Sequence, residues 1–237
     1  MTKIRKLVLF DFDGTLADTA PDLAAAANKQ RVRRGLDPLP EAELRPWSSY
    51  GARGLLKAAL GVETTDPEFP ALREQFLADY EAGMTDNTTL FPGIRELLDT
   101  LKANGLEWGI VTNKLEYLAI PQAVHLGLHN DCVVTVGGDT TDHIKPHPAP
   151  LLYAAKKANI DPAQCIYVGD DERDIIAGKA AGMATVVAAY GYCGPETAAI
   201  RGWEADAIAD SAADIWPAVQ QWAAELDRSA AEARTGV

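Results

Sequence analysis

The sequence contains little cysteine, and the three that occur are not spaced for a metal site or a disulfide framework. Cys132, Cys165 and Cys193 are far apart in 237 residues, and none belongs to a Cys-x-x-Cys pair. An odd number of cysteines at wide spacing indicates neither a zinc site nor paired disulfides. We expect them to be small, buried apolar side chains.

Positive charge is also scarce. There are 22 Lys and Arg against 34 Asp and Glu, which gives a formal net charge of −12. Proteins that bind nucleic acid usually present a basic stripe to the phosphate backbone, so nucleic acid is not expected as a partner. A small anionic substrate remains compatible with this composition if basic groups and a metal ion gather in one place.

Long apolar runs are missing too. No stretch approaches the roughly 18 apolar residues of a membrane span, so no membrane partner is expected. The first six residues lead directly into a candidate strand, which leaves no room for a signal peptide and favours a cytoplasmic protein. The length and the 47% hydrophobic content allow one large domain, or a core with a smaller module. Monomer and homodimer both remain open.

The most informative stretch lies near the amino terminus. Four apolar residues, 7–10, predict a strand buried on both faces of a parallel sheet, and the run stops at Asp11. Asp13 and Gly14 follow, and a glycine permits a sharp turn that would hold both carboxylates at the carboxyl end of the strand. The acids could be ordinary solvated turn residues. Alternatively, two acids this close repel each other and attract a hard cation, Mg²⁺ by preference.

Residues 19–89 have the composition of helices and contain no convincing strand. The predicted helices are 22–34, 41–45, 53–60 and 70–82. A wholly helical insert between the first strand and the next is best explained by a separate small domain. We therefore expect a helical cap domain at 17–90 and a catalytic core formed by 1–16 and 91–237, with a hinge at Phe91-Pro92-Gly93.

From residue 92 onward, strands and helices alternate. The predicted strands are 108–111, 132–136, 165–168, 184–189 and a short one at 207–209; the predicted helices are 94–104, 116–126, 150–158, 172–181 and one near 215–222. Repeated strand-then-helix units imply a parallel sheet with right-handed crossovers, so the fold class is α/β with a Rossmann-like core. The tail from Arg228 is expected to be loose.

Polar residues follow the ends of these strands or can reach them. They are Thr112 and Asn113, Lys145, Asp170 and Asp171, and Asp174 one helical turn further on. Each has an ordinary explanation by itself: a helix cap for Thr112, a solvated side chain for Lys145, and first-turn acids for Asp171 and Asp174. Because the carboxyl ends of parallel strands meet at one edge of the sheet, a single site explains them better together.

The string from Leu7 to Thr19, together with these later residues, resembles the four motifs of the haloacid dehalogenase superfamily in order and spacing. The resemblance implies that Asp11 attacks phosphorus and forms an aspartyl-phosphate, and that Asp13 is the general acid and base. Dehalogenases and phosphonate hydrolases of that superfamily lack an acid at the second position. Asp13 therefore points to a Mg²⁺-dependent phosphomonoesterase.

The same resemblance assigns roles to the remaining residues. Mg²⁺ would be held by Asp11, by the main-chain carbonyl of Asp13 and by Asp170. Thr112 and Asn113 would hold phosphate oxygens, and Lys145 would offset charge at the nucleophile. Asp171 and Asp174 are expected behind these ligands, because Mg²⁺ rarely accepts a full cage of carboxylates.

The choice of substrate is expected to lie in the cap. The helical insert resembles that of phosphoglycolate phosphatase-like enzymes, and two glycines bracket Arg53, which either grips a substrate carboxylate or faces solvent. Similarity to bacterial N-acetylmuramic acid 6-phosphate phosphatases keeps that sugar phosphate as an alternative. A β-phosphoglucomutase-like enzyme is disfavoured by Gly169 before Asp170. A phospho-accepting receiver domain or binding module is an alternative of another class, although receivers are about half this length.

Overall fold

The centre of the molecule is a six-stranded sheet in which every pairing is parallel. The computed structural model describes residues 4–195 and 197–235. The strands are β1 (Leu7–Phe10), β4 (Glu107–Val111), β5 (Cys132–Val136), β6 (Cys165–Gly169), β7 (Ala184–Ala188) and β8 (Ala207–Ala209), in the order β5-β4-β1-β6-β7-β8. All four residues of β1 are fully buried between β4 and β6, as their apolar run predicts.

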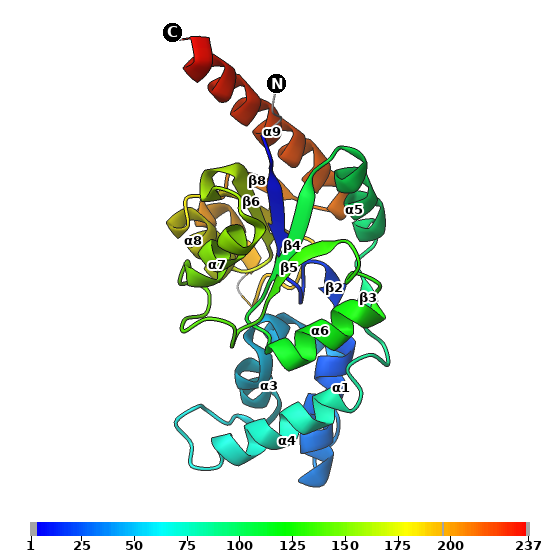
Figure 1. Ribbon diagram of the computed structural model, residues 1–237. Coiled ribbons are helices and arrows are strands. Elements are labelled where there is room, and N and C mark those ends of the chain that lie inside the picture. Colours follow the sequence, from blue (N-terminus) through cyan, green and yellow to red (C-terminus); the bar gives the residue numbers. More distant parts are fainter. Residues whose placement is uncertain (1–3, 196, 236–237) are drawn as a thin grey trace.

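Helices cover both faces of the sheet (Figure 1). They are α5 (Ile94–Ala103), α7 (Ala149–Ala158), α8 (Glu172–Ala180) and α9 (Ala212–Thr235), whereas α6 (Glu116–His125) lies at the lower end of the sheet beside the insert. Because side chains alternate along a strand, Val8 and Phe10 of β1 pack in the cluster that includes residues of α5 and α9. Leu7 and Leu9 face the other way, toward residues of α7 and α8. The predicted α/β Rossmann-like core is confirmed.

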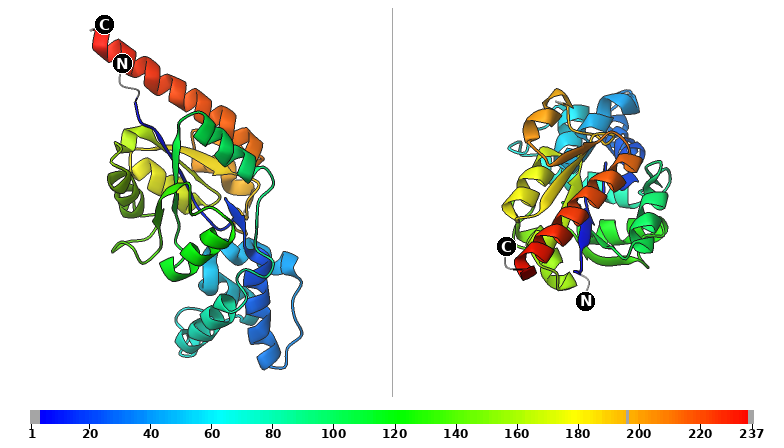
Figure 2. Two further views of the ribbon diagram at one scale, coloured as in Figure 1. Left: turned by 45° about the vertical axis from the view of Figure 1, so that its right-hand side comes forward. Right: turned by 90° about the horizontal axis from the view of Figure 1, so that it is seen from above.

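The predicted helical insert forms a second body below the carboxyl ends of the strands (Figure 2). It contains α1 (Ala20–Arg33), α2 (Glu41–Leu44), the 3-10 helix η1 (Arg45–Tyr50), α3 (Gly51–Leu60) and α4 (Phe69–Glu81). These helices bury their own apolar cluster, which includes Leu55, Phe76 and Tyr80. Leu118 of α6 joins the cluster, so α6 packs between the core and the insert.

A two-stranded ribbon, which the sequence does not predict, joins the two bodies. Strands β2 (Ala17–Asp18) and β3 (Thr89–Leu90) pair antiparallel. Beside them, the buried carboxylate of Asp22 accepts hydrogen bonds from the backbone and side chains of Asn87 and Thr88 at 2.8–3.1 Å. Two-residue strands are too short to show an alternating pattern. We propose this ribbon as the border of a cap that spans 17–90.

The carboxyl-terminal helix is longer than the sequence suggests. The prediction of a loose tail from Arg228 is wrong, because α9 continues to Thr235. Its first half is held by buried Ile215 and Val219, and Asp227 forms an ion pair with Lys6 at 2.6 Å. Beyond that pair the helix carries mostly Ala, Glu and Arg, which favour helix without tertiary contacts. Among the described residues, no helix is both long enough and apolar enough to cross a bilayer.

Candidate active site

A cavity of about 310 Å³ lies between the carboxyl end of the sheet and the cap. The residues predicted for the site that line it are Asp11, Asp13, Arg53, Thr112, Asn113, Lys145, Asp171 and Asp174. Asp170 lies behind them and is fully buried. Lys114, Arg73 and Arg173 also line the cavity, so this acidic protein gathers basic side chains at one place, as binding of a small anion requires.

The turn after β1 brings the first two acids to the cavity. Gly14 adopts a left-handed conformation with φ of 85° and donates from its backbone to the carbonyl of Ala17 at 3.0 Å. A Cβ atom on Gly14 would lie 2.3 Å from a carboxylate oxygen of Asp170. Only glycine therefore satisfies both the backbone angle and the close approach of this loop to β6.

Gly14→Ala should reduce both stability and activity. An alanine in the left-handed backbone conformation lowers the free energy of unfolding by roughly 1–2 kcal/mol. Its Cβ atom would also clash with Asp170 and displace that side chain from the site. Gly182→Ala is the matched control, because Gly182 has φ of 74° and a Cβ atom added there would meet nothing within 4 Å. Urea denaturation and phosphate release should show activity loss only in Gly14→Ala. Equal effects of the two changes on activity would contradict this account.

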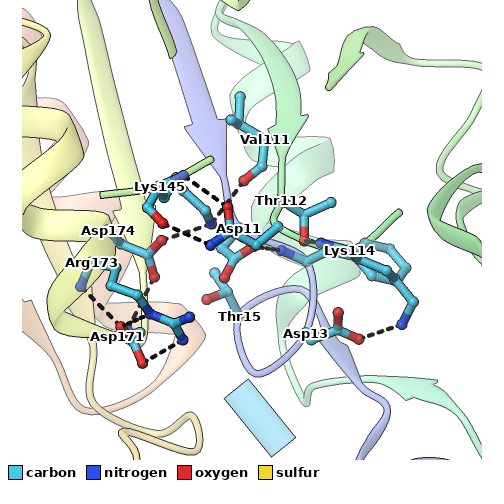
Figure 3. Close-up of polar contacts among 12 residues, drawn as sticks. Asp11, Asp13, Thr15, Val111, Thr112, Lys114, Lys145, Asp171, Arg173 and Asp174 are labelled. Carbon is cyan, nitrogen blue, oxygen red and sulfur yellow. Dashed lines mark hydrogen bonds and ion pairs between the residues drawn. The ribbon is translucent and has the colours of Figure 1, made fainter. Parts of the chain in front are cut away.

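Lys145 is the cation nearest the proposed nucleophile. Its ammonium, 2% exposed, lies 2.9 Å from Asp11 Oδ1 and 2.7 Å from Asp174 Oδ1 (Figure 3). It also donates to the Tyr167 hydroxyl at 2.8 Å. Burial acts to lower the pKa of Lys145, but the two carboxylates outweigh it and raise the pKa. Lys145 is therefore a permanent positive charge beside Asp11.

Three carboxylates crowd together next to this lysine. Oxygens of Asp11, Asp170 and Asp174 lie within 4.8 Å of one another. Burial, followed by repulsion from Asp11 and Asp174, raises the pKa of Asp170 well above its usual value. Burial also raises the pKa of Asp11 to about 6, although Lys145 opposes the shift. Such a set of hard oxygen donors fits a divalent cation, and Mg²⁺ is the expected ion.

Asp13 is held by two groups that the sequence does not single out. Its Oδ1 accepts hydrogen bonds from the Thr19 hydroxyl and from Lys114, whose ammonium lies 2.7 Å away. Lys114 also donates to the hydroxyl of Tyr80 in the cap at 2.7 Å. Burial acts to lower the pKa of Lys114, but Asp13 and Tyr80 outweigh it and raise the pKa. Lys114 follows Asn113 directly, and position alone gives no sign of this contact.

The loop after β4 places the predicted phosphate-binding pair. The Thr112 side chain is buried at the cavity wall, and its hydroxyl accepts a bond from the Lys114 backbone at 3.2 Å. The side-chain amide of Asn113 bonds both backbone groups of Lys145, at 2.9 and 3.0 Å. Asn113 thereby fixes the loop that carries Lys145. Because the side-chain amide is occupied, we expect any contact of Asn113 with phosphate to come from its backbone N–H.

The acids that follow β6 take different positions. Asp171 caps α8 and pairs with Arg173 at 2.6 Å; burial acts to raise its pKa, but Arg173 outweighs burial and lowers it. Asp174 completes the capping box by accepting from the Asp171 backbone at 3.1 Å. Its other oxygen contacts Lys145, so Asp174 lies in the acid cluster itself, closer than the sequence suggests.

Arg53 faces the cavity from the first turn of α3 and is exposed. Its guanidinium lies 5.8 Å from the ring centre of Tyr50, which also lines the cavity. Arg53 thus lies near the start of a helix in contact with solvent, and it also belongs to the lining of the cavity. Its binding of a substrate carboxylate stays a prediction.

A carboxylate beside a buried lysine, a second acid and a cluster of three carboxylates at one cavity fit a phosphoric monoester hydrolase, and the parallel sheet with its helical insert agrees with that class. The chain belongs to the haloacid dehalogenase-like hydrolase family, whose model matches residues 8–188. The receiver-domain alternative is therefore wrong.

Individual relatives match over most of the chain. A phosphoglycolate phosphatase from Xanthomonas campestris is 43% identical over 212 residues, which cover 89% of this chain and 95% of that protein. An N-acetylmuramic acid 6-phosphate phosphatase from Pseudomonas aeruginosa is 42% identical over 205 residues, covering 86% and 90%. The crystal structure of a predicted phosphoglycolate phosphatase from Haemophilus somnus is 34% identical with a TM-score of 0.78, covering 92% and 99%.

Proposed function

We propose that this hydrolase is a Mg²⁺-dependent phosphomonoesterase that acts through an aspartyl-phosphate on Asp11, with phosphoglycolate as its substrate. The observation that supports it most is the position of the Asp11 carboxylate, 2.9 Å from Lys145 and within the cluster of Asp170 and Asp174, at a cavity lined with basic side chains. The names of the relatives agree with this substrate.

The chain's own residues support a two-step reaction. An oxygen of Asp11 forms a bond to phosphorus while the ester P–O bond breaks, and Asp13 gives its proton to the departing alkoxide. Asp13, now ionised, takes a proton from water as the water oxygen attacks phosphorus, and the bond to Asp11 breaks. Lys145, Thr112 and the Asn113 backbone N–H stabilise the phosphoryl oxygens.

The acid cluster supports a proposed site for the metal ion. Asp11 and Asp170 are the side chains that would hold Mg²⁺, with the Asp13 carbonyl as the third proposed protein ligand. When bound, Mg²⁺ supplies positive charge that offsets repulsion between the Asp11 carboxylate and the phosphate.

Removal of divalent cations should therefore suppress phosphate release. We expect a chelator to lower kcat by about 100-fold or more, because two anionic groups must meet without a cation between them. Added Mg²⁺ should restore the activity, whereas Ca²⁺, which tolerates more ligands and irregular geometry, should restore little. Phosphate release from phosphoglycolate, measured by malachite green, tests this. Full activity in the chelator would rule out the metal assignment.

Arg53 offers a test of the substrate class. If its guanidinium binds a substrate carboxylate, Arg53→Ala should lower kcat/KM for phosphoglycolate by about 10- to 100-fold, the value of one charge-assisted hydrogen bond. Hydrolysis of p-nitrophenyl phosphate, which has no carboxylate, should change little. Arg34→Ala is the control, because Arg34 forms an exposed cap ion pair with Glu68. Equal losses on both substrates would show that Arg53 does not recognise the carboxylate.

The size of the cavity favours N-acetylmuramic acid 6-phosphate as a second candidate. A volume of about 310 Å³ is large for a two-carbon acid and lies at the lower end of pockets that hold drug-sized ligands. The cap side of the cavity includes apolar Leu23, Phe76 and Leu77, against which a sugar ring could pack. That compound also carries a carboxylate, so Arg53→Ala does not separate the two. Comparison of kcat/KM for both esters does.

A further inference from the structure

Lys114 is a buried cation at the cavity wall that the two-step reaction does not use. Its side chain is 6% exposed, and its ammonium lies 2.7 Å from both Asp13 Oδ1 and the Tyr80 hydroxyl. The rings of Phe12 and Tyr80 lie 5.6 and 4.7 Å from it. A buried ammonium needs such partners, and here one comes from the turn after β1 and the other from cap helix α4.

The contacts on Asp13 are distributed unequally between its two oxygens. Lys114 and the Thr19 hydroxyl both donate to Oδ1. Two donors on one oxygen fix the plane of the carboxylate and leave Oδ2 as the oxygen available to exchange a proton with a substrate. Figure 3 shows the Asp13 side chain turned toward Lys114.

Both donors are themselves anchored. The Thr19 backbone donates to the Tyr192 hydroxyl at 2.8 Å. The Tyr80 hydroxyl that accepts from Lys114 also accepts from the Gln122 amide of α6 at 3.0 Å. The same amide group donates to the carbonyl of Met84 in the turn after α4. The position of Lys114 is thus defined by the core and the cap together.

We propose that Lys114 is a positioning residue for Asp13: its ammonium donates a hydrogen bond to Oδ1, so that Oδ2 carries the proton to the leaving group, and Tyr80 holds the ammonium in place from the cap. This inference rests on the proposed function, in which Asp13 protonates the departing alkoxide. A misplacement of about 1 Å at a reacting group can lower a rate by roughly 100-fold, so the contact is large enough to measure.

The choice of leaving group isolates this role. An alkoxide is a poor leaving group and needs the proton from Asp13 as the P–O bond breaks, whereas p-nitrophenolate departs without one. The ratio kcat/KM includes the steps up to release of the alcohol, so it reports this proton transfer and not the later attack of water. A residue that only supports the fold, or only binds phosphate, would affect both esters alike.

The test compares wild type with Lys114→Met on p-nitrophenyl phosphate and on phosphoglycolate, or N-acetylmuramic acid 6-phosphate if that is the better substrate. Lys114→Met should lower kcat/KM for the alkyl ester by about 10- to 100-fold and for the aryl ester by no more than about threefold. Lys114→Arg, which keeps the charge, should recover part of the loss. Tyr80→Phe should also lower kcat/KM for the alkyl ester relative to that for the aryl ester, by a smaller factor. Lys102→Met, at an exposed pair with Asp131, is the control.

Asp13→Asn separates the inference from the function on which it rests. Asp13→Asn should show the same preference for the aryl ester. The double variant with Lys114→Met should show no further change in kcat/KM for the alkyl ester relative to the aryl ester. If Asp13→Asn affects both esters equally, the proposed acid role of Asp13 fails. If Asp13→Asn is selective but Lys114→Met and Tyr80→Phe lower both esters equally, the positioning role fails while the proposed function stands. Thermal unfolding of each variant identifies those that lose activity by unfolding.

Discussion

Asp11→Asn should abolish phosphate release, with kcat reduced on the order of 10⁴-fold or more, because the amide has nearly the shape of the carboxylate but is not a nucleophile. The variant should remain folded. Lys145 keeps its 2.7 Å ion pair with Asp174, and the change removes one charge from a crowded acid cluster. Loss of activity in a folded protein would therefore report the chemistry of Asp11.

Covalent trapping distinguishes a nucleophile from a residue that only binds metal. Wild-type enzyme quenched with acid during turnover of a radiolabelled phosphate ester should carry label that hydroxylamine releases, as an acyl phosphate does. Asp11→Asn should carry none. Asp99→Asn is the matched control, because Asp99 is exposed on α5 and receives the same change of charge. Label retained in Asp11→Asn, or more than a few per cent of the activity, would contradict the aspartyl-phosphate route.

The convergence of the predicted site residues follows from topology that the sequence makes visible. Asp11 follows β1, Thr112 follows β4 and Asp170 follows β6, and these three strands are neighbours in the sheet. A short apolar run that ends in polar residues identifies both the strand and its carboxyl end. Parallel pairing then places all three ends at one edge. This part of the site could be predicted from the sequence.

The groups that hold the site in place could not be predicted in the same way. Tyr167 lies in the middle of an apolar run and is read as a strand residue, yet its hydroxyl donates to the Val111 carbonyl at 2.7 Å and accepts from Lys145. Tyr80 lies within the predicted cap helix 70–82, but its hydroxyl contacts Lys114 of the core. Hydrophobic periodicity records that such a side chain is buried. It does not record where the polar end of that side chain lies.

Asn113 and Asp174 show a related limit of prediction from the sequence. Their positions next to strand ends place them correctly near the site, but the partner of each side chain depends on a loop. Asn113 bonds the backbone of Lys145, 32 residues away, and Asp174 contacts the ammonium of the same lysine. Because that loop has no periodic pattern, its path over the sheet is known only from the structure.

Lys145→Met should lower both stability and activity. The ammonium compensates Asp11 and Asp174, both of which stay behind in a buried site when it is removed. Removal of one partner of a buried ion pair lowers the free energy of unfolding by about 3–5 kcal/mol. Loss of the charge beside the transferring phosphoryl group should lower kcat by about 10²- to 10³-fold. Lys57→Met, at an exposed ion pair with Glu63, is the control and should change the free energy of unfolding and kcat little.

The stability loss in Lys145→Met should depend on pH with a definite sign. In wild type, burial raises the pKa of Asp11 from 3.8 to about 6 while Lys145 opposes the shift, so without Lys145 the folded-state pKa is higher still. A carboxyl group whose pKa is raised by folding binds its proton more tightly in the folded state, so stability falls as pH rises through that range. The difference between wild type and Lys145→Met should be small near pH 4, where the Asp11 carboxyl of the folded protein is protonated, and larger near pH 8. Urea denaturation between pH 4 and pH 8 in the absence of Mg²⁺ measures this difference in the free energy of unfolding. A difference that is constant with pH would mean that Lys145 stabilises the fold by packing rather than by its charge.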